Sequence, residues 1–204
     1  MGQKIIHLVR HGHFQSSGTG SDPLGNSLSD LGREQAYLVA QRLRQFPIDC
    51  IHYSSMRRAA ETASVIATEF PGVPLQASEL LWEFSWKVFT DAVYALTGRG
   101  EALEQVEQTK QRIAIAFEQY FSPCLTEANQ HEIVVCHGNI IRYFVCRALQ
   151  ISPETSSSME SANCGISTFL IDTSGRLMLI TYNDIGHLPL AKQTYIRYVP
   201  VGHL

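Results

Sequence analysis

The sequence has few features that would place the protein outside the cell or in a membrane. Its five cysteines form no C-x-x-C pair, and an odd number of cysteines cannot close completely into disulfides. We therefore expect free, buried thiols in a reducing compartment. No window of the chain approaches the length of a membrane helix, and the N-terminal apolar run is too short for a signal peptide. These absences predict a soluble, cytoplasmic protein without a membrane partner.

The sequence also has no charge block, no low-complexity tract, no internal repeat and no excess of basic charge. Its formal net charge is -3, whereas nucleic-acid-binding domains usually have a basic face and a high pI. We therefore expect no nucleic-acid partner. With 204 residues and 45% hydrophobic residues, the chain is predicted to form one globular domain over residues 1–204. Of its 16 basic residues 12 are arginine, whose planar fork matches phosphate and carboxylate oxygens.

Apolar, β-branched runs alternate along the chain with segments of helical period. The runs cover residues 4–9, 48–53 and 132–137, and the helical segments cover 27–46, 57–70, 101–121 and 139–150. Ser29 or Asp30 is the expected N-cap of the first helix. In the last third, two alternating runs joined by "DTSG" predict an antiparallel hairpin. The pattern predicts an α/β fold with a mixed, mostly parallel sheet.

Histidines and arginines follow each of the three predicted βα strands. In chain order they are Arg10 with His11, Arg57 with Arg58, and His137 with Gly138. In open sheets built from βα units the site lies beyond the carboxyl ends of the strands, so these residues are expected at one edge. Cations buried together are costly unless an anion lies between them. We predict a phosphoryl site made of arginine forks and backbone N–H groups at helix N-termini, with Gly138, just before the fourth predicted helix, among the phosphate-binding residues.

Two further roles follow from the chemistry of a phosphate ester. An unprotonated imidazole nitrogen of His11 facing the phosphoryl group is a competent nucleophile. The leaving alkoxide needs a proton, which a carboxyl group in an apolar pocket can hold. Glu83 in "LLWEFSW" fits, because desolvation by its neighbours should raise its pKa, although a surface carboxylate beside core aromatics is an equal alternative. Glu61 is a rival whose spacing favours a local ion pair with Arg57 and Arg58.

Four segments carry a resemblance to a known family. "LVRHGH", "LSDLGREQA", "YSSMRRAAETA" and "VVCHGNIIR" resemble, in order and spacing, the signature segments of the histidine phosphatase superfamily, over about residues 5 to 142. "YSSM", "RYFVCRALQ" and the closing hairpin are similar to its mitochondrial phosphoglycerate-mutase-like serine/threonine protein phosphatases, to about residue 190. The sequence shows no counterpart of their membrane anchor or N-terminal oligomerisation segment, so we expect neither their location nor their assembly to carry over.

The resemblance implies a phosphoglycerate-mutase-like fold, a three-layer αβα sandwich, and an assignment of roles. His11 would be the phosphorylated nucleophile, and Glu83 the proton donor. Arg10, Arg58 and His137 would bind the phosphoryl oxygens. His137 would also be a catalytic residue, together with His11 and Glu83. Arg57 would be a flanking residue.

Several functions compete for this set of residues. The first is a phosphatase acting on phosphoserine, phosphothreonine or a phosphorylated metabolite. A mutase would need a long, arginine-bearing insertion to exclude water, whereas residues 84–100 contain only Lys87 and Arg99 as basic residues. A phosphate-binding module without turnover would not need the whole catalytic set.

A metal hydrolase could use His7, His11 and His13, which alternate on one strand face, but no carboxylate or cysteine ligand lies at a recognisable spacing. We therefore predict a cofactor-free, metal-independent phosphoric monoester hydrolase acting on a phosphorylated protein or small molecule. The sequence leaves the particular substrate and the oligomeric state open.

Overall fold

The computed structural model describes residues 2–15, 24–89, 100–124 and 126–195. Six strands form one sheet in the order β3-β2-β4-β1-β5-β6. They are β1 (Lys4–Arg10), β2 (Cys50–Ser54), β3 (Leu75–Ser78), β4 (Gln130–Cys136), β5 (Ile166–Ile171) and β6 (Leu177–Asp184). The first four pair in parallel, whereas β5 is antiparallel to both β1 and β6. The predicted mixed, mostly parallel sheet is confirmed.

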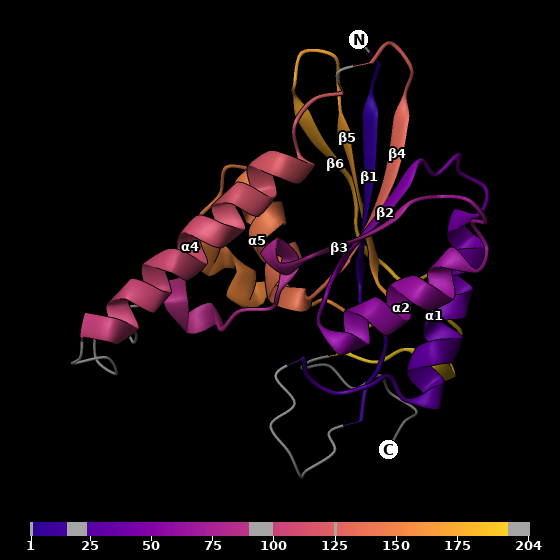
Figure 1. The fold of residues 1–204 in the computed structure, drawn as a ribbon, viewed down its shortest axis with the longest axis horizontal. Coiled ribbons are helices and arrows are strands. Elements are labelled where there is room, and N and C mark those ends of the chain that lie inside the picture. The colour runs from indigo at the N-terminus through magenta and orange to yellow at the C-terminus, as the bar shows by residue number, and fades with distance from the viewer. Residues whose placement is uncertain (1, 16–23, 90–99, 125, 196–204) are drawn as a thin grey trace.

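Helices cover both faces of this sheet. Figure 1 shows α1 (Asp30–Leu43) and α2 (Arg57–Ala67) on one side, and α4 (Gly100–Tyr120) and α5 (Gly138–Ala148) on the other. Successive side chains of a strand point to opposite faces. Val9 of β1 therefore packs in the core beneath α1 and α2, whereas Leu8 packs in the core beneath α4 and α5. The predicted three-layer αβα sandwich is confirmed.

The helix limits follow the local capping chemistry. The side chain of Ser29 accepts a hydrogen bond from the amide of Gly32 at 3.1 Å, so Ser29 is the N-cap and Asp30 the first residue of α1. Gly32 itself approaches the loop after β1 so closely that a Cβ atom there would lie 2.0 Å from the carbonyl oxygen of His13. Only glycine fits this contact, so the first turn of α1 lies against that loop.

The sequence did not predict β3 or the short 3-10 helices. They are η1 (Glu79–Leu81), η2 (Trp86–Phe89), η3 (Pro153–Ser158) and η4 (Leu190–Lys192). β3 has four residues, most of them exposed, because it is an edge strand paired only with β2. A strand so short and so open to solvent leaves no alternation to detect.

The cysteines are free, as their odd number and spacing predicted. All five cysteines are free; Cys50 is partly buried, and the other four, Cys124, Cys136, Cys146 and Cys164, are buried. Burial raises the pKa of the Cys50 and Cys146 thiols. Among the helices that the structure describes, none combines the length and the apolar character needed to cross a bilayer.

Candidate active site

The carboxyl ends of β1, β2 and β4 bring the predicted residues to one edge of the sheet. β4 lies between the other two strands, with Arg10 opposite Cys136 and Tyr53 opposite Val135. His11 and His137 directly follow β1 and β4, and their ring centroids are 5.2 Å apart. Arg58 is the second residue of α2, which follows β2. The topology therefore brings together side chains that are separated by more than a hundred residues in the chain.

The hydrogen bonds of His11 assign its tautomer. Its ring is almost fully buried, and Nδ1 lies 2.8 Å from the carbonyl oxygen of Gly12. A carbonyl oxygen can only accept, so Nδ1 carries the proton and Nε2 has the free lone pair. That lone pair accepts a hydrogen bond from Nε of Arg58 at 3.0 Å. Burial, followed by the charges of Arg10, His137 and Arg58, lowers the pKa of His11 well below its usual range, so the ring is neutral.

His137 is fully buried at the N-cap position of α5. Its Nε2 lies 2.8 Å from the hydroxyl oxygen of Ser54, whereas its Nδ1 is buried with no partner among the described residues. Burial, with the charges of Arg58 and Arg10, lowers the pKa of this imidazole well below its usual range. A second neutral imidazole with one unused polar atom therefore lies beside His11. Gly138, the first residue of α5, is buried next to it.

The two arginines are held differently. Arg10 is buried, and its Nη1 donates to the carbonyl oxygen of Ser161, while its Nε has no partner among the described residues. Burial lowers the pKa of Arg10 to about 10, partly offset by Glu83, so it remains charged at neutral pH. Arg58 is partly buried, with its guanidinium carbon 5.3 Å from the ring centroid of Phe14. Arg57, by contrast, is exposed.

Glu83 follows η1 and is partly buried at the same edge. Its Oε1 accepts from the amide of Phe84 at 3.1 Å, and its Oε2 accepts from the amide of Asn139 at 3.3 Å. Burial raises the pKa of this carboxyl group, while the two amides and the charges of Arg10 and Arg58 oppose that shift. The setting is more polar than "LLWEFSW" suggested, because α5 and the arginines approach it from distant parts of the chain.

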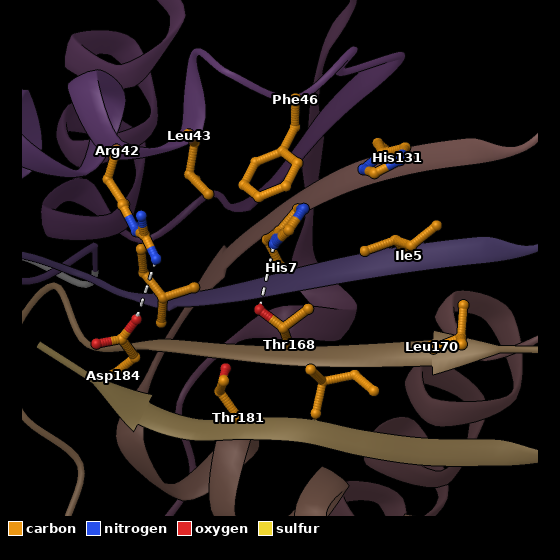
Figure 2. A pocket seen from close by; sticks show the side chains of 12 residues that line it. Ile5, His7, Arg42, Leu43, Phe46, His131, Thr168, Leu170, Thr181 and Asp184 are labelled. Carbon is orange, nitrogen blue, oxygen red and sulfur yellow. Dashed lines mark hydrogen bonds and ion pairs between the residues drawn. The ribbon is translucent and has the colours of Figure 1, made fainter. Parts of the chain in front are cut away.

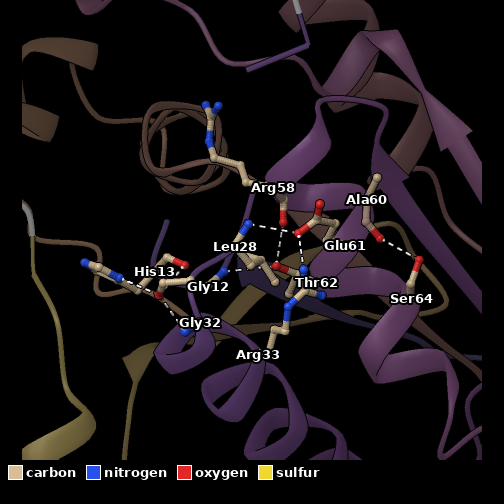
Figure 3. A network of polar contacts seen from close by, with 11 residues as sticks. Gly12, His13, Leu28, Gly32, Arg33, Arg58, Ala60, Glu61, Thr62 and Ser64 are labelled. Atoms are coloured by element: carbon tan, nitrogen blue, oxygen red, sulfur yellow. Dashed lines mark hydrogen bonds and ion pairs between the residues drawn. The ribbon is translucent and has the colours of Figure 1, made fainter. Parts of the chain in front are cut away.

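Glu61 faces a different part of the protein. Its Oε2 accepts from the amide of Leu28 at 2.9 Å and lies 3.2 Å from Nη2 of Arg33 (Figure 3). The expected local ion pair with Arg58 is corrected, because Arg58 turns toward the free lone pair of His11. Glu61 instead joins α2 to the chain that leads into α1.

A threonine that the sequence analysis did not identify holds the loop after β1. The hydroxyl of Thr62 accepts from the amide of Gly12 at 3.0 Å and donates to the carbonyl oxygen of Arg58 at 2.7 Å (Figure 3). The one available signal was its position, one helical turn after Arg58 on α2. Thr62 therefore joins the backbone beside His11 to the helix that carries Arg58.

The three histidines of the metal alternative have separate partners. Figure 2 shows His7 beside Phe46, with ring centroids 4.8 Å apart, and its Nδ1 is 3.3 Å from the hydroxyl oxygen of Thr168. His13 has its Nδ1 2.8 Å from the hydroxyl oxygen of Ser29, and His11 faces Arg58. Within the described residues, no group of three or more His, Cys, Asp or Glu side chains is placed to hold a metal ion.

The mutase alternative rested on residues 84–100. Residues 90–99, including Arg99, lie outside the described part of the chain, so the expectation that this segment favours hydrolysis stays a prediction. The same holds for the roles assigned to the site residues from the sequence. The structure places these residues together at one edge of the sheet.

The fold has close counterparts among solved structures. A phosphoglycerate mutase from Plasmodium falciparum superposes with a TM-score of 0.63 at 30% sequence identity, covering 93% of this chain and 96% of that one. A phosphoserine phosphatase from Entamoeba histolytica superposes with a TM-score of 0.68 at 22% identity, covering 91% and 100% of the two chains. These neighbours confirm the predicted phosphoglycerate-mutase-like fold.

Curated relatives resemble the chain more closely in sequence. The mitochondrial serine/threonine-protein phosphatase PGAM5 of Mus musculus is 36% identical over 193 residues, or 93% of this chain and 65% of that protein. Its counterpart in Caenorhabditis briggsae is 33% identical over 198 residues, or 90% and 64%. The chain thus spans just under two thirds of the length of these relatives. Their names contradict the predicted cytoplasmic location, which rested only on features that the sequence lacks and is therefore wrong.

A family model matches most of the chain. The match runs over residues 6–184 and includes both strand-end histidines and the hairpin of β5 and β6. Its description agrees with the order of motifs in the sequence and with the site at the edge of the sheet. The chain therefore belongs to the histidine phosphatase superfamily, branch 1.

Proposed function

We propose that the protein is a metal-independent phosphatase that hydrolyses phosphate monoesters through a phosphohistidine on His11. The observation that carries this proposal is the tautomer of His11, whose Nδ1 is occupied by the carbonyl oxygen of Gly12 and whose Nε2 keeps its lone pair. A neutral imidazole beside two arginines is arranged to attack a phosphoryl group whose charge the arginines neutralise.

The first half of the proposed reaction forms the intermediate. Nε2 of His11 attacks phosphorus, the phosphorus–oxygen bond to the substrate breaks, and Glu83 gives its proton to the leaving alkoxide. Arg10 and Arg58 bind the phosphoryl oxygens. Nδ1 of His137, which has no partner among the described residues, faces another of these oxygens, next to the N-terminal amides of α5 at Gly138.

The second half releases phosphate. Glu83, now ionised, takes a proton from water, and the resulting hydroxide oxygen bonds to phosphorus while the phosphorus–nitrogen bond breaks. The bonding electrons return to Nε2 of His11, and inorganic phosphate leaves. The burial that raises the pKa of Glu83 supports its service as acid and then as base.

The substrate class comes from the relatives. Because the curated relatives are named serine/threonine-protein phosphatases, we propose that phosphoserine or phosphothreonine in a protein is the substrate. Their names also make mitochondria the proposed location. The mutase name of one solved neighbour keeps phosphoglycerate as the substrate to compare. We further propose that residues 1–204 act as one domain, since all six strands form a single sheet.

The proposal is tested by measuring phosphate release from a phosphoserine peptide and from 3-phosphoglycerate, with and without EDTA. Because arginine side chains supply the positive charge, EDTA is expected to leave the rate within about 2-fold of its original value. Loss of activity that Zn²⁺ or Mn²⁺ restores would contradict metal independence. Isomerised phosphoglycerate without phosphate release would indicate a mutase, and binding without turnover would indicate a binding module.

Neighbouring arginines provide a test of the phosphoryl site. Arg58→Ala is expected to lower kcat/KM by about 10² to 10³, the usual loss for one donor to a transition-state oxygen. Arg57→Ala is the matched control, because Arg57 is exposed, and is expected to stay within about 3-fold of wild type. Steady-state kinetics on one phosphopeptide measures both. Equal losses would mean that Arg58 does not have the proposed role.

A further inference from the structure

Residues His11, Gly12 and His13 are here called the histidine loop. All six of their backbone N–H and C=O groups have hydrogen-bond partners. The amide of His11 donates to Cys136, that of Gly12 to Thr62, and the carbonyl oxygens of Gly12 and His13 accept from the His11 ring and from the amide of Ser29. Two groups remain, the carbonyl oxygen of His11 and the amide of His13. Each is bound by an amide side chain from elsewhere in the protein, and the carbonyl oxygen of His11 also accepts a longer bond, at 3.4 Å, from the amide of Cys164.

Those side chains are Asn163 and Gln35. Nδ2 of Asn163 donates to the carbonyl oxygen of His11 at 2.9 Å, and Oε1 of Gln35 accepts from the amide of His13 at 2.8 Å. Both are buried, Gln35 fully, so water does not readily replace these bonds. Gln35 lies on α1 and Asn163 in the turn before β5, so the two side chains reach the histidine loop from separate segments of the chain.

Thr194 joins the two amides. Its hydroxyl oxygen accepts from Nε2 of Gln35 at 3.0 Å, and the same hydroxyl donates to Oδ1 of Asn163 at 2.9 Å. Its backbone carbonyl oxygen accepts from the amide of Asn163, also at 2.9 Å. A hydroxyl has one proton to donate, so these bonds set which way round each side-chain amide lies. The orientation of Gln35 and Asn163 in turn presents the correct atom to each end of the histidine loop.

We propose that Thr194 is a positioning residue that, through Gln35 and Asn163, holds the histidine loop with Nε2 of His11 directed into the phosphoryl site. This inference rests on the proposed function of His11. It connects the C-terminal part of the chain, more than 180 residues away in sequence, to the reacting nitrogen. Among the hydrogen bonds of the described residues, those of the Thr194 hydroxyl go to Gln35 and Asn163, so Thr194 acts on His11 through these two amides.

Loss of the hydroxyl affects both ends of the loop at once. Without it, Nε2 of Gln35 loses one of its two acceptors, and Oδ1 of Asn163 loses its side-chain donor. Buried polar groups left without partners drive side chains to rotate toward new ones. Such a rotation takes a partner from the amide of His13 or the carbonyl oxygen of His11. A displacement of about 1 Å at a reacting atom lowers the rate by about 10²-fold.

The test compares Thr194→Val, which keeps the side-chain shape without the hydroxyl, with Thr194→Ser, which keeps the hydroxyl. The valine variant is expected to lower kcat by about 10- to 10²-fold, with KM changed by less than about 3-fold, and the serine variant to restore kcat to within about 2-fold. Thr181→Val, the same change at an exposed position of β6, is the control and is expected to behave as wild type. If the valine variant does not fold, Thr194→Ala removes the same hydroxyl.

A second readout does not require activity. Hydrogen exchange at the amide of His13 in the ligand-free protein is expected to be about 10-fold faster in the valine variant, because its bond to Gln35 weakens. Unchanged exchange at His13, or a serine variant as slow as the valine variant, would overturn the inference. If wild type releases no phosphate, the proposed function fails, and the exchange measurement still decides whether Thr194 holds the loop.

Discussion

His11→Ala is expected to reduce turnover of a phosphoserine peptide by at least about 10⁴-fold, because it removes the proposed nucleophile rather than weakening a contact. His137, whose ring centroid lies 5.2 Å from that of His11, is expected to keep binding the phosphoryl oxygens without replacing His11 in the attack. His131→Ala is the control, because His131 lies near the start of β4, at the opposite end of that strand from His137. It is expected to keep the rate of wild type.

The same variant tests the intermediate. Quenching wild type during turnover of a labelled substrate is expected to leave a phosphoramidate on the protein that is stable in base and labile in acid. Because Nδ1 of His11 is held by the carbonyl oxygen of Gly12, the phosphoryl group is expected on Nε2. A His11→Ala protein that still turns over at the wild-type rate, or a label on another residue, would show that the nucleophile has been misassigned.

Glu83→Gln is expected to have a large effect that depends on the leaving group. A serine alkoxide needs a proton as it leaves, whereas a nitrophenolate leaves readily as an anion. Turnover of a phosphoserine peptide is therefore expected to fall by about 10² to 10⁴, and turnover of nitrophenyl phosphate by much less. The glutamine has one oxygen and can accept from only one of the two amides, of Phe84 and Asn139, so the missing proton is read from the difference between the two substrates.

Glu79→Gln is the matched control for this comparison. Glu79 begins η1, four residues before Glu83, and is exposed, so the same substitution there is expected to change neither rate by more than about 2-fold. An equal loss with both substrates in Glu83→Gln would mean that Glu83 shapes the pocket without donating the proton. The proton donor would then have to be sought at another residue of the site.

The sequence was sufficient for the features that are local or periodic. The strands that carry Arg10 and His137 have clear apolar runs, and the rule for the carboxyl ends of parallel strands brought their ends together correctly. Ser29 was found as a cap because capping depends on a few neighbouring residues. The polar surroundings of Glu83 were missed, because the amide of Asn139 reaches it from 56 residues away.

The supporting contacts of the histidine loop were beyond prediction for a similar reason. Gln35 lies within "LSDLGREQA", but nothing in that segment assigns it a role, and Asn163 and Thr194 are polar residues outside every motif; all three lie away from His11 in the sequence. The bonds of Gln35 and Asn163 to the histidine loop, and the bond of Thr194 to Asn163, depend on the packing of α1, the turn before β5 and the C-terminal segment against one another. Glu61 was misassigned because spacing on one helix suggested Arg58, whereas Arg33 of α1 lies closer in space.

The hydrogen bond from Arg58 to Nε2 of His11 means that the resting protein has its reactive lone pair covered. A neutral electrophile does not compete for the guanidinium of Arg58, so Nε2 of His11 stays hydrogen-bonded to it. In the proposed mechanism, the oxygens of a phosphate ester bind arginine more strongly than a neutral nitrogen does, so substrate binding draws Arg58 away and uncovers the lone pair. If His11 is the nucleophile, the negative charge by which the site recognises a substrate is therefore also what makes His11 available to react with it.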